Sequence, residues 1–307
     1  MTDTALKLGG YALLVGVAAP WALVRARWAH RAPAAALLAW QTLIVSFVVA
    51  VALAVPRPAA ARAHLPEGLV ALLGACGFLP AGRAPAAAPT PAETLLLAVP
   101  ALVVLVPLAV FARTAWRARR HRADHARLLD LIGTESERYG ATVVDHAVPA
   151  VYCLPGRARR IVVTRGALEC LTEAGLRAVL AHERSHLRGR HHLLLAATAA
   201  FARVLPRLPL ARHAREQTAL LVEMAADDRA LREHSREELA TAMYEMAAGR
   251  APRAALGAAG PDGSGALIRM CRMLTPGARP HRALWPAVLT GAAGAPLLPV
   301  LLACHTF

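Results

Sequence analysis

Paired cysteines are missing from this sequence. Its five cysteines lie far apart along the chain, and none of them forms a C-x-x-C pair. They are Cys76, Cys153, Cys170, Cys271 and Cys304. This spacing argues against a cysteine zinc site and against a thioredoxin-type redox motif. We expect these residues to stay reduced and to act mostly as small apolar side chains.

Acidic residues are scarce. The chain has 20 Asp and Glu against 35 Lys and Arg, which gives a net charge of +15. A strongly basic chain can bind nucleic acid, anionic lipid or an acidic partner. Here the arginines crowd next to long apolar runs, as they do on the cytoplasmic flanks of membrane helices. We therefore expect the lipid bilayer as a partner and no direct contact with nucleic acid.

Apolar residues are abundant, at 56% of the chain with a mean hydropathy of +0.41. Four uncharged runs predict membrane-spanning helices at about 8–24, 34–55, 94–112 and 284–303. Each is near the roughly 20 residues that a helix needs to cross about 30 Å of hydrocarbon. The alternative is a set of very apolar core helices. A signal peptide is disfavoured for the first run, because arginines follow it where small residues would mark a cleavage site.

Three basic flanks predict the topology. They contain Arg25, Arg27 and Arg31, then Arg113, Arg117, Arg119, Arg120, Arg122 and Arg127, then Arg279 and Arg282. Because Lys and Arg collect on the cytoplasmic side, both termini are expected outside the plasma membrane and residues 113–283 inside the cell. The Ala- and Pro-rich loop 56–93 is then an external linker.

The domain organisation follows from these runs. Residues 1–112 form a membrane region with three spans, 113–283 a cytoplasmic domain, and 284–307 the fourth span with a short tail.

Within the domain, local patterns predict short strands and then helices. The strands are expected at 141–144, 150–154 and 160–164, and the helices from the Thr172 cap to about His192, at 214–233, and at 236–248 after the Ser235 cap. The apolar run 193–205 is expected to continue as a buried or membrane-touching helix, and 251–265 as a loop. The fold class is α+β, mainly helical, with a small sheet.

The string His182-Glu183-Arg184-Ser185-His186 matches H-E-x-x-H. On a helix, residues i and i+4 lie on one face, so both imidazoles can bind the same zinc ion. Glu183 stands beside them and can reach a water molecule at that ion as general base. The alternative is a solvated helix face with two stray histidines.

A second acidic pair stands further along the chain, at Glu223 and Asp227. Glu223 is the natural third zinc ligand, since His₂Glu with an open fourth position is a common catalytic set. Asp227, one helical turn on, can accept a bond from a ligand histidine and fix its tautomer. Alone, the pair would be interpreted as a charged helix face. Downstream of H-E-x-x-H, the ligand interpretation is favoured.

The chain resembles a known family in the stretches Val148–Gly156, Ile161–Leu168 and Val179–Leu187, and in Glu223–Asp227. It looks like the beta-lactam-receptor type of membrane zinc metallopeptidase, the BlaR/MecR antirepressor peptidases. Membrane proteases of the heat-shock and prenyl-protein-processing kind share the core motif. The resemblance covers about residues 120–280.

The resemblance implies a zincin-like (gluzincin) domain with one Zn²⁺ bound by His182, His186 and Glu223. It implies Glu183 as the catalytic base, Asp227 as a supporting residue, and protein substrates that include the peptidase itself and a DNA-binding repressor. The extracellular penicillin-binding domain of the beta-lactam receptors is not expected here, since the chain ends at Phe307 and has no S-x-x-K motif of that domain.

The predicted function is a membrane-embedded, regulatory zinc metalloendopeptidase that cleaves itself, a cytoplasmic repressor, or both. The alternatives are a membrane quality-control protease and a non-catalytic receptor or scaffold with a structural zinc site.

Several other residues are expected near or outside the site. We expect His191 and His192 to be polar or interfacial, off the ligand face. His234 and Tyr244 are candidates for stabilising an oxyanion. Strand 160–164 is a candidate edge for an extended peptide.

Overall fold

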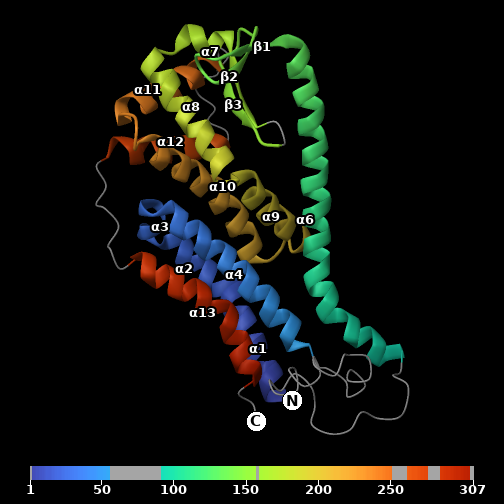
Figure 1. Ribbon diagram of the computed structural model, residues 1–307. Helices are drawn as coiled ribbons and strands as arrows, with labels where there is room; N and C mark the ends of the chain where they lie inside the picture. The colour runs from blue at the N-terminus through green and yellow to red at the C-terminus, as the bar shows by residue number, and fades with distance from the viewer. Residues whose placement is uncertain (1, 56–90, 157–158, 251–260, 276–283, 305–307) are drawn as a thin grey trace. The chain divides into compact units, whose positions relative to one another are not determined.

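The computed structural model describes residues 2–55, 91–156, 159–250, 261–275 and 284–304 (Figure 1). The helices before the sheet are α1 (Thr2–Leu13), a π-helical turn (Leu14–Ala18), α2 (Ala19–Arg25), α3 (Arg27–Arg31), α4 (Pro33–Ala54) and α6 (Pro91–Ile132). The strands are β1 (Gly133–Ser136), β2 (Ala141–Val144), β3 (Val151–Leu154) and β4 (Arg160–Thr164). The helices after the sheet are α7 (Arg165–Cys170), α8 (Glu173–Arg188), α9 (His191–Val204), α10 (Pro209–Ala230), α11 (Arg236–Arg250), α12 (Pro261–Leu274) and α13 (Leu284–Cys304).

The chain forms two compact units. One comprises residues 1–112, 198–217 and 280–307, and the other comprises 113–197 and 218–279. Helices α6, α9 and α10 each contribute to both units. The mainly helical character with a small sheet agrees with the fold class predicted from the sequence.

In the first unit, α4 packs against α1 and α13. Trp40 of α4 is fully buried, and the hydroxyl of Tyr11 donates to the carbonyl of Ala295 at 2.8 Å. Four helical segments are long and apolar enough to cross a membrane: Thr4–Arg25, Pro33–Ala54, Ala98–Ile132 and Leu284–Ala303. The four apolar runs of the sequence therefore do form helices.

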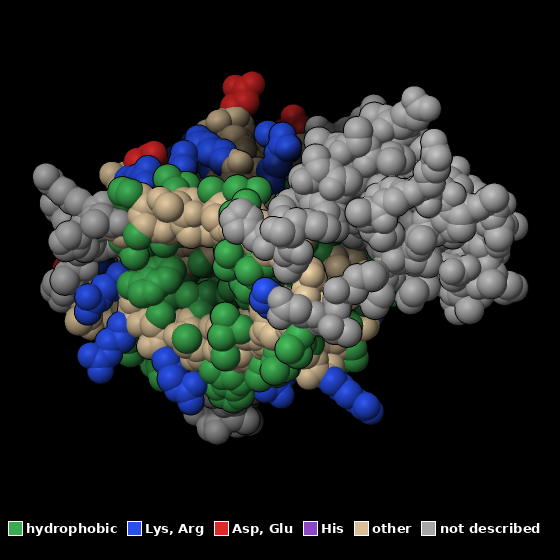
Figure 2. All heavy atoms as spheres, turned by 90° about the horizontal axis from the view of Figure 1, so that it is seen from below, with side chains coloured by type: hydrophobic (Ala, Val, Ile, Leu, Met, Phe, Trp, Pro, Cys, Tyr) green, Lys and Arg blue, Asp and Glu red, His purple; other side chains and the backbone are tan. Residues whose placement is uncertain are grey.

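Large apolar side chains on these helices are left exposed. Leu105 of α6 is 58% exposed, and Leu289 and Leu301 of α13 are 54% and 52% exposed. Figure 2 shows one face of the molecule on which hydrophobic side chains gather, with lysine and arginine side chains toward its margin. Helix α6 also extends well past the predicted end at residue 112, because the Ala-, Arg- and Leu-rich sequence that follows favours helix up to Gly133.

The second unit contains a four-stranded sheet in the order β1-β2-β4-β3. Strands β2 and β4 are parallel, and the other two pairs are antiparallel. Buried side chains of β4, α7, α8 and α11 form its apolar core, including Val163, Leu176, Leu180 and Leu239. Three strands match the predicted ranges to within one residue, whereas β1 was not predicted. The expectation that residues 160–164 form a free edge was wrong, because β4 lies between β2 and β3, and the edge strands are β1 and β3.

Some helix boundaries differ from those predicted. Helix α8 starts after the Thr172 cap as expected but ends at Arg188 rather than about His192, because Arg190 adopts a left-handed conformation with φ 49°. The Ser235 cap of α11 is confirmed, with the amide of Glu238 donating to its hydroxyl at 3.2 Å. Helix α12 covers residues 261–265 of the predicted loop, while 251–260 lie outside the described residues. The linker predicted at 56–93 also lies outside them, up to residue 90.

Candidate metal centre

Helix α8 carries the H-E-x-x-H motif and is fixed at its start and along one face. The hydroxyl of Thr172 accepts from the amide of Gly175 at 3.1 Å and so caps the first turn. An apolar stripe that includes Leu176, Val179 and Leu180 is buried in the core. With that stripe anchored, the helix places His182 in a buried position, at 7% exposure.

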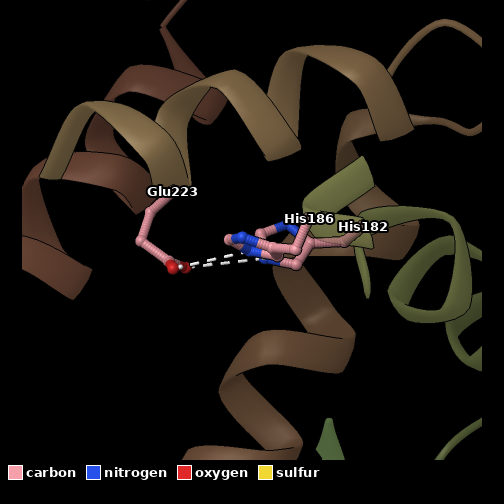
Figure 3. A group of neighbouring side chains, drawn as sticks. All are labelled: His182, His186 and Glu223. Atoms are coloured by element: carbon pink, nitrogen blue, oxygen red, sulfur yellow. Dashed lines mark hydrogen bonds and ion pairs between the residues drawn. The ribbon is translucent and has the colours of Figure 1, made fainter. Parts of the chain in front are cut away.

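His182, His186 and Glu223 converge on one point (Figure 3). The two Nε2 atoms lie 3.1 Å apart. The carboxylate of Glu223, from α10, lies 3.5 Å from each of them, through Oε2 to His182 and Oε1 to His186. Among the described residues, this is the group of His, Cys, Asp and Glu side chains that can hold a metal ion.

The spacing of these three atoms fits a zinc ion. For metal–ligand distances near 2.0–2.1 Å, two ligand atoms of a tetrahedral site are about 3.3–3.4 Å apart. The observed separations of 3.1 to 3.5 Å bracket that value. Two imidazoles and one carboxylate are also the donor set of catalytic zinc sites, which leave the fourth position open. The residues present therefore fit the metal.

Asp227 lies behind His182, one turn beyond Glu223 on α10. Its side chain is fully buried, and its Oδ1 is 2.9 Å from Nδ1 of His182. The contact is defined by this short distance, and Nδ1 of His182 makes no well-aligned hydrogen bond. Asp227 therefore lies beside Nδ1, the ring nitrogen of His182 that does not face His186 and Glu223. A group in this position fixes the tautomer of a ligand histidine.

Arg269 of α12 was not anticipated from the sequence. Its guanidinium donates from Nε and Nη2 to the two oxygens of Asp227, both at 2.8 Å. Its Nη1 lies 2.9 Å from Oε2 of Glu223. One partly buried arginine thus contacts both Glu223 and Asp227. No local signal marks it, because Arg269 lies 42 residues from Asp227 along the chain.

Glu183 points toward the edge strand. Its Oε2 accepts from the backbone N–H of Cys153 in β3 at 2.9 Å. Burial raises the pKa of Glu183 above its usual range, against the lowering influence of His182 and Cys153. A carboxyl group with a raised pKa is suited to take up and return a proton near neutral pH.

Charges inside the site oppose one another. Burial alone would lower the pKa of His182, but Asp227 and Glu223 outweigh it and raise the pKa to about 9. Burial would raise the pKa of Asp227, but Arg269 and His182 outweigh it and bring it to about 2. Burial lowers the pKa of His186 to about 4. Asp227 is therefore held ionised by Arg269 and His182.

The remaining candidates from the sequence fall differently. His191, expected off the ligand face, is 7% exposed, and its Nδ1 lies 3.0 Å from Nδ1 of His186. That expectation was wrong because the chain turns back at Gly189 and Arg190 instead of continuing α8. Tyr244 is 64% exposed, and no contact in the described part of the chain joins Tyr244 or His234 to the three converging side chains.

Residues 115–250 match the family model of peptidase family M48. The match covers fewer than half of the residues of the chain and supports a metallopeptidase of this family. Comparison with curated proteins and with solved structures finds no match for the chain. The metallopeptidase is a peptide-bond hydrolase, and the matched region includes the H-E-x-x-H motif, Glu223 and Asp227 but not Arg269.

Proposed function

We propose that the chain is a membrane-embedded zinc metalloendopeptidase. Its zinc ion would be held by His182, His186 and Glu223, with Asp227 supporting His182 and Glu183 acting as the catalytic base. The observation that carries this proposal is the convergence of two Nε2 atoms and a carboxylate at 3.1 to 3.5 Å, beside the partly buried Glu183. A scaffold with a closed structural site would need a fourth protein ligand, and the described residues offer a group of three.

The residues divide the chemical work. Zinc, when bound, supplies Lewis acidity that polarises a carbonyl group and makes water more acidic near neutral pH. Glu183 takes a proton at its carboxylate and returns it to the leaving amine.

An extended protein segment is the proposed substrate. Strand β3 is one of the two edge strands of the sheet, and the amide of Cys153 on that edge faces Glu183. A peptide that pairs with an edge strand forms backbone hydrogen bonds and lies fully extended. Pairing along β3 would bring its peptide bonds to the side of Glu183.

Embedding in the membrane is supported by the four long apolar helices and by their exposed leucines. We further propose a regulatory role, with cleavage of the peptidase itself or of a cytoplasmic repressor. This finer assignment rests on the resemblance to the BlaR/MecR antirepressor peptidases and on the order of three apolar helices, peptidase domain and fourth apolar helix.

The test uses the purified full-length chain and its Glu183→Gln variant. The variant keeps the side-chain size and the zinc, and it loses the base, so cleavage of itself or of a partner falls roughly 10²–10⁴-fold. Glu237→Gln, an exposed glutamate in the first turn of α11, serves as the matched control and cleaves like the wild type. Equal cleavage by wild type and Glu183→Gln would sink the proposal. Identifying the proteins that co-purify with the inactive variant shows whether the substrate is a repressor or a damaged membrane protein.

A further inference from the structure

His191 closes against one of the two candidate ligand histidines. Its ring is 7% exposed and meets the ring of His186 edge-on, with centroids 4.9 Å apart and an interplanar angle of 89°. The two Nδ1 atoms are 3.0 Å apart, which is a hydrogen-bonding distance. His186 therefore has a polar partner on the side of its ring that faces away from Glu223.

The backbone is shaped to bring His191 to this position. Arg190 adopts a left-handed conformation with φ 49°, which is uncommon for a residue with a side chain. Gly189 before it has no room for a side chain, since a Cβ atom there would lie 2.3 Å from Nε2 of His191. The amide of Gly189 still donates to the carbonyl of Ser185 at 2.8 Å. The chain thus leaves α8 in a tight turn that folds the ring of His191 back over the end of that helix.

The direction of the hydrogen bond follows from the role of His186. The Nε2 atom of His186 faces His182 and Glu223. A neutral imidazole that binds a metal ion through Nε2 uses the lone pair of that atom, so its proton is on Nδ1. Nδ1–H of His186 then donates to Nδ1 of His191, which must be unprotonated. Nδ1 of His182 is instead occupied by the carboxylate of Asp227. The two candidate ligands are held by different chemistry, one by a carboxylate and one by a neutral imidazole.

We propose that His191 is a positioning residue for the metal site: it holds His186 in the tautomer and the ring orientation that zinc binding requires. This inference rests on the proposed function. Partners of ligand histidines typically change metal affinity 10- to 100-fold when they are removed.

The experiment measures the zinc dissociation constant of the purified full-length chain by competition with a chelator. His191→Leu removes the acceptor, and the dissociation constant is expected to rise roughly 10- to 100-fold. His191→Asn places an amide oxygen where Nδ1 stood, and this variant is expected to bind zinc nearly as well as the wild type. His192→Leu changes the neighbouring histidine in the same way and is expected to leave the dissociation constant unchanged.

Two results would overturn the positioning role. One is a dissociation constant for His191→Leu equal to that of the wild type. The other is equal weakening in the Leu and Asn variants, which would mean that a hydrogen-bond acceptor at residue 191 is not what holds His186. A wild-type chain that binds no zinc would overturn the proposed function and this inference with it. Zinc binding by the wild type with no effect at residue 191 would overturn this inference alone.

Discussion

At the residue scale, the acidic side of the candidate site depends on one arginine. Asp227 is fully buried, and Arg269 forms a bidentate ion pair with it. Arg269→Met would leave that carboxylate without its cation, and breaking a buried ion pair costs about 3–5 kcal/mol. We expect a marked fall in the thermal unfolding midpoint. The fall should be smaller for Arg269→Lys, which keeps the positive charge but cannot form the bidentate hydrogen bonds of the guanidinium group. Arg272→Met on the same helix is the control, because its partner Asp228 is 39% exposed and the pair is worth less.

Glu223 gives a second prediction at this scale. It is one of three proposed ligands, so Glu223→Ala should lose bound zinc, as His182→Ala and His186→Ala should. The measurement is the metal content of the purified chain after dialysis. Glu216→Ala is the control, because the Glu216 side chain lies on the exposed face of α10, two turns before Glu223. It removes a carboxylate from the same helix without touching the proposed ligands. Full zinc occupancy and activity in Glu223→Ala would place the third ligand elsewhere.

The sequence predicted those site residues whose spacing is local. His182, Glu183 and His186 share one helix, and Glu223 and Asp227 lie one turn apart on another, so helical periodicity was enough to group each set. Arg269 and His191 were missed for a different reason. Arg269 reaches the site only through the placement of α12, and His191 only through the turn at Gly189 and Arg190. Neither arrangement leaves a periodic pattern in the chain.

At the element scale, strand positions were predictable but strand order was not. Pro155 and Gly156 mark the end of β3, and β-branched residues mark β4. The parallel pairing of β2 with β4 puts β3 at the edge, and nothing local in the sequence specifies it. Strand β1 was missed because Gly133–Ser136 is short and polar.

Thr164 links the end of β4 to its surroundings. Its hydroxyl accepts from the amide of Ala150 at 2.8 Å and donates to the carbonyl of Val148 at 2.9 Å. Thr164→Val keeps the shape of the side chain but strips both backbone groups of their partner, which costs about 1–3 kcal/mol. We expect a lower unfolding midpoint in a thermal melt. Thr134→Val, on the exposed side of β1, should melt like the wild type, and equal midpoints for both variants would contradict the role of Thr164.

At the scale of the whole molecule, the proposed membrane embedding predicts which side of the bilayer each segment faces. The four long helices were predictable because an apolar run of about 20 residues has few other stable states. Their orientation is a prediction from the arginines alone. Because the basic flanks follow the first and third spans and precede the fourth, they would all lie in the cytoplasm with the peptidase domain.

Cysteine labelling of intact cells tests this orientation, in a chain whose native cysteines are replaced by serine. Ala60→Cys, in the loop between the second and third spans, should react with a membrane-impermeant maleimide. Glu137→Cys, in the exposed turn between β1 and β2, should not react until the cells are permeabilised. The permeabilised sample also shows that the second thiol is accessible. Labelling of Glu137→Cys in intact cells would put the peptidase domain outside, where a cytoplasmic repressor cannot be its substrate.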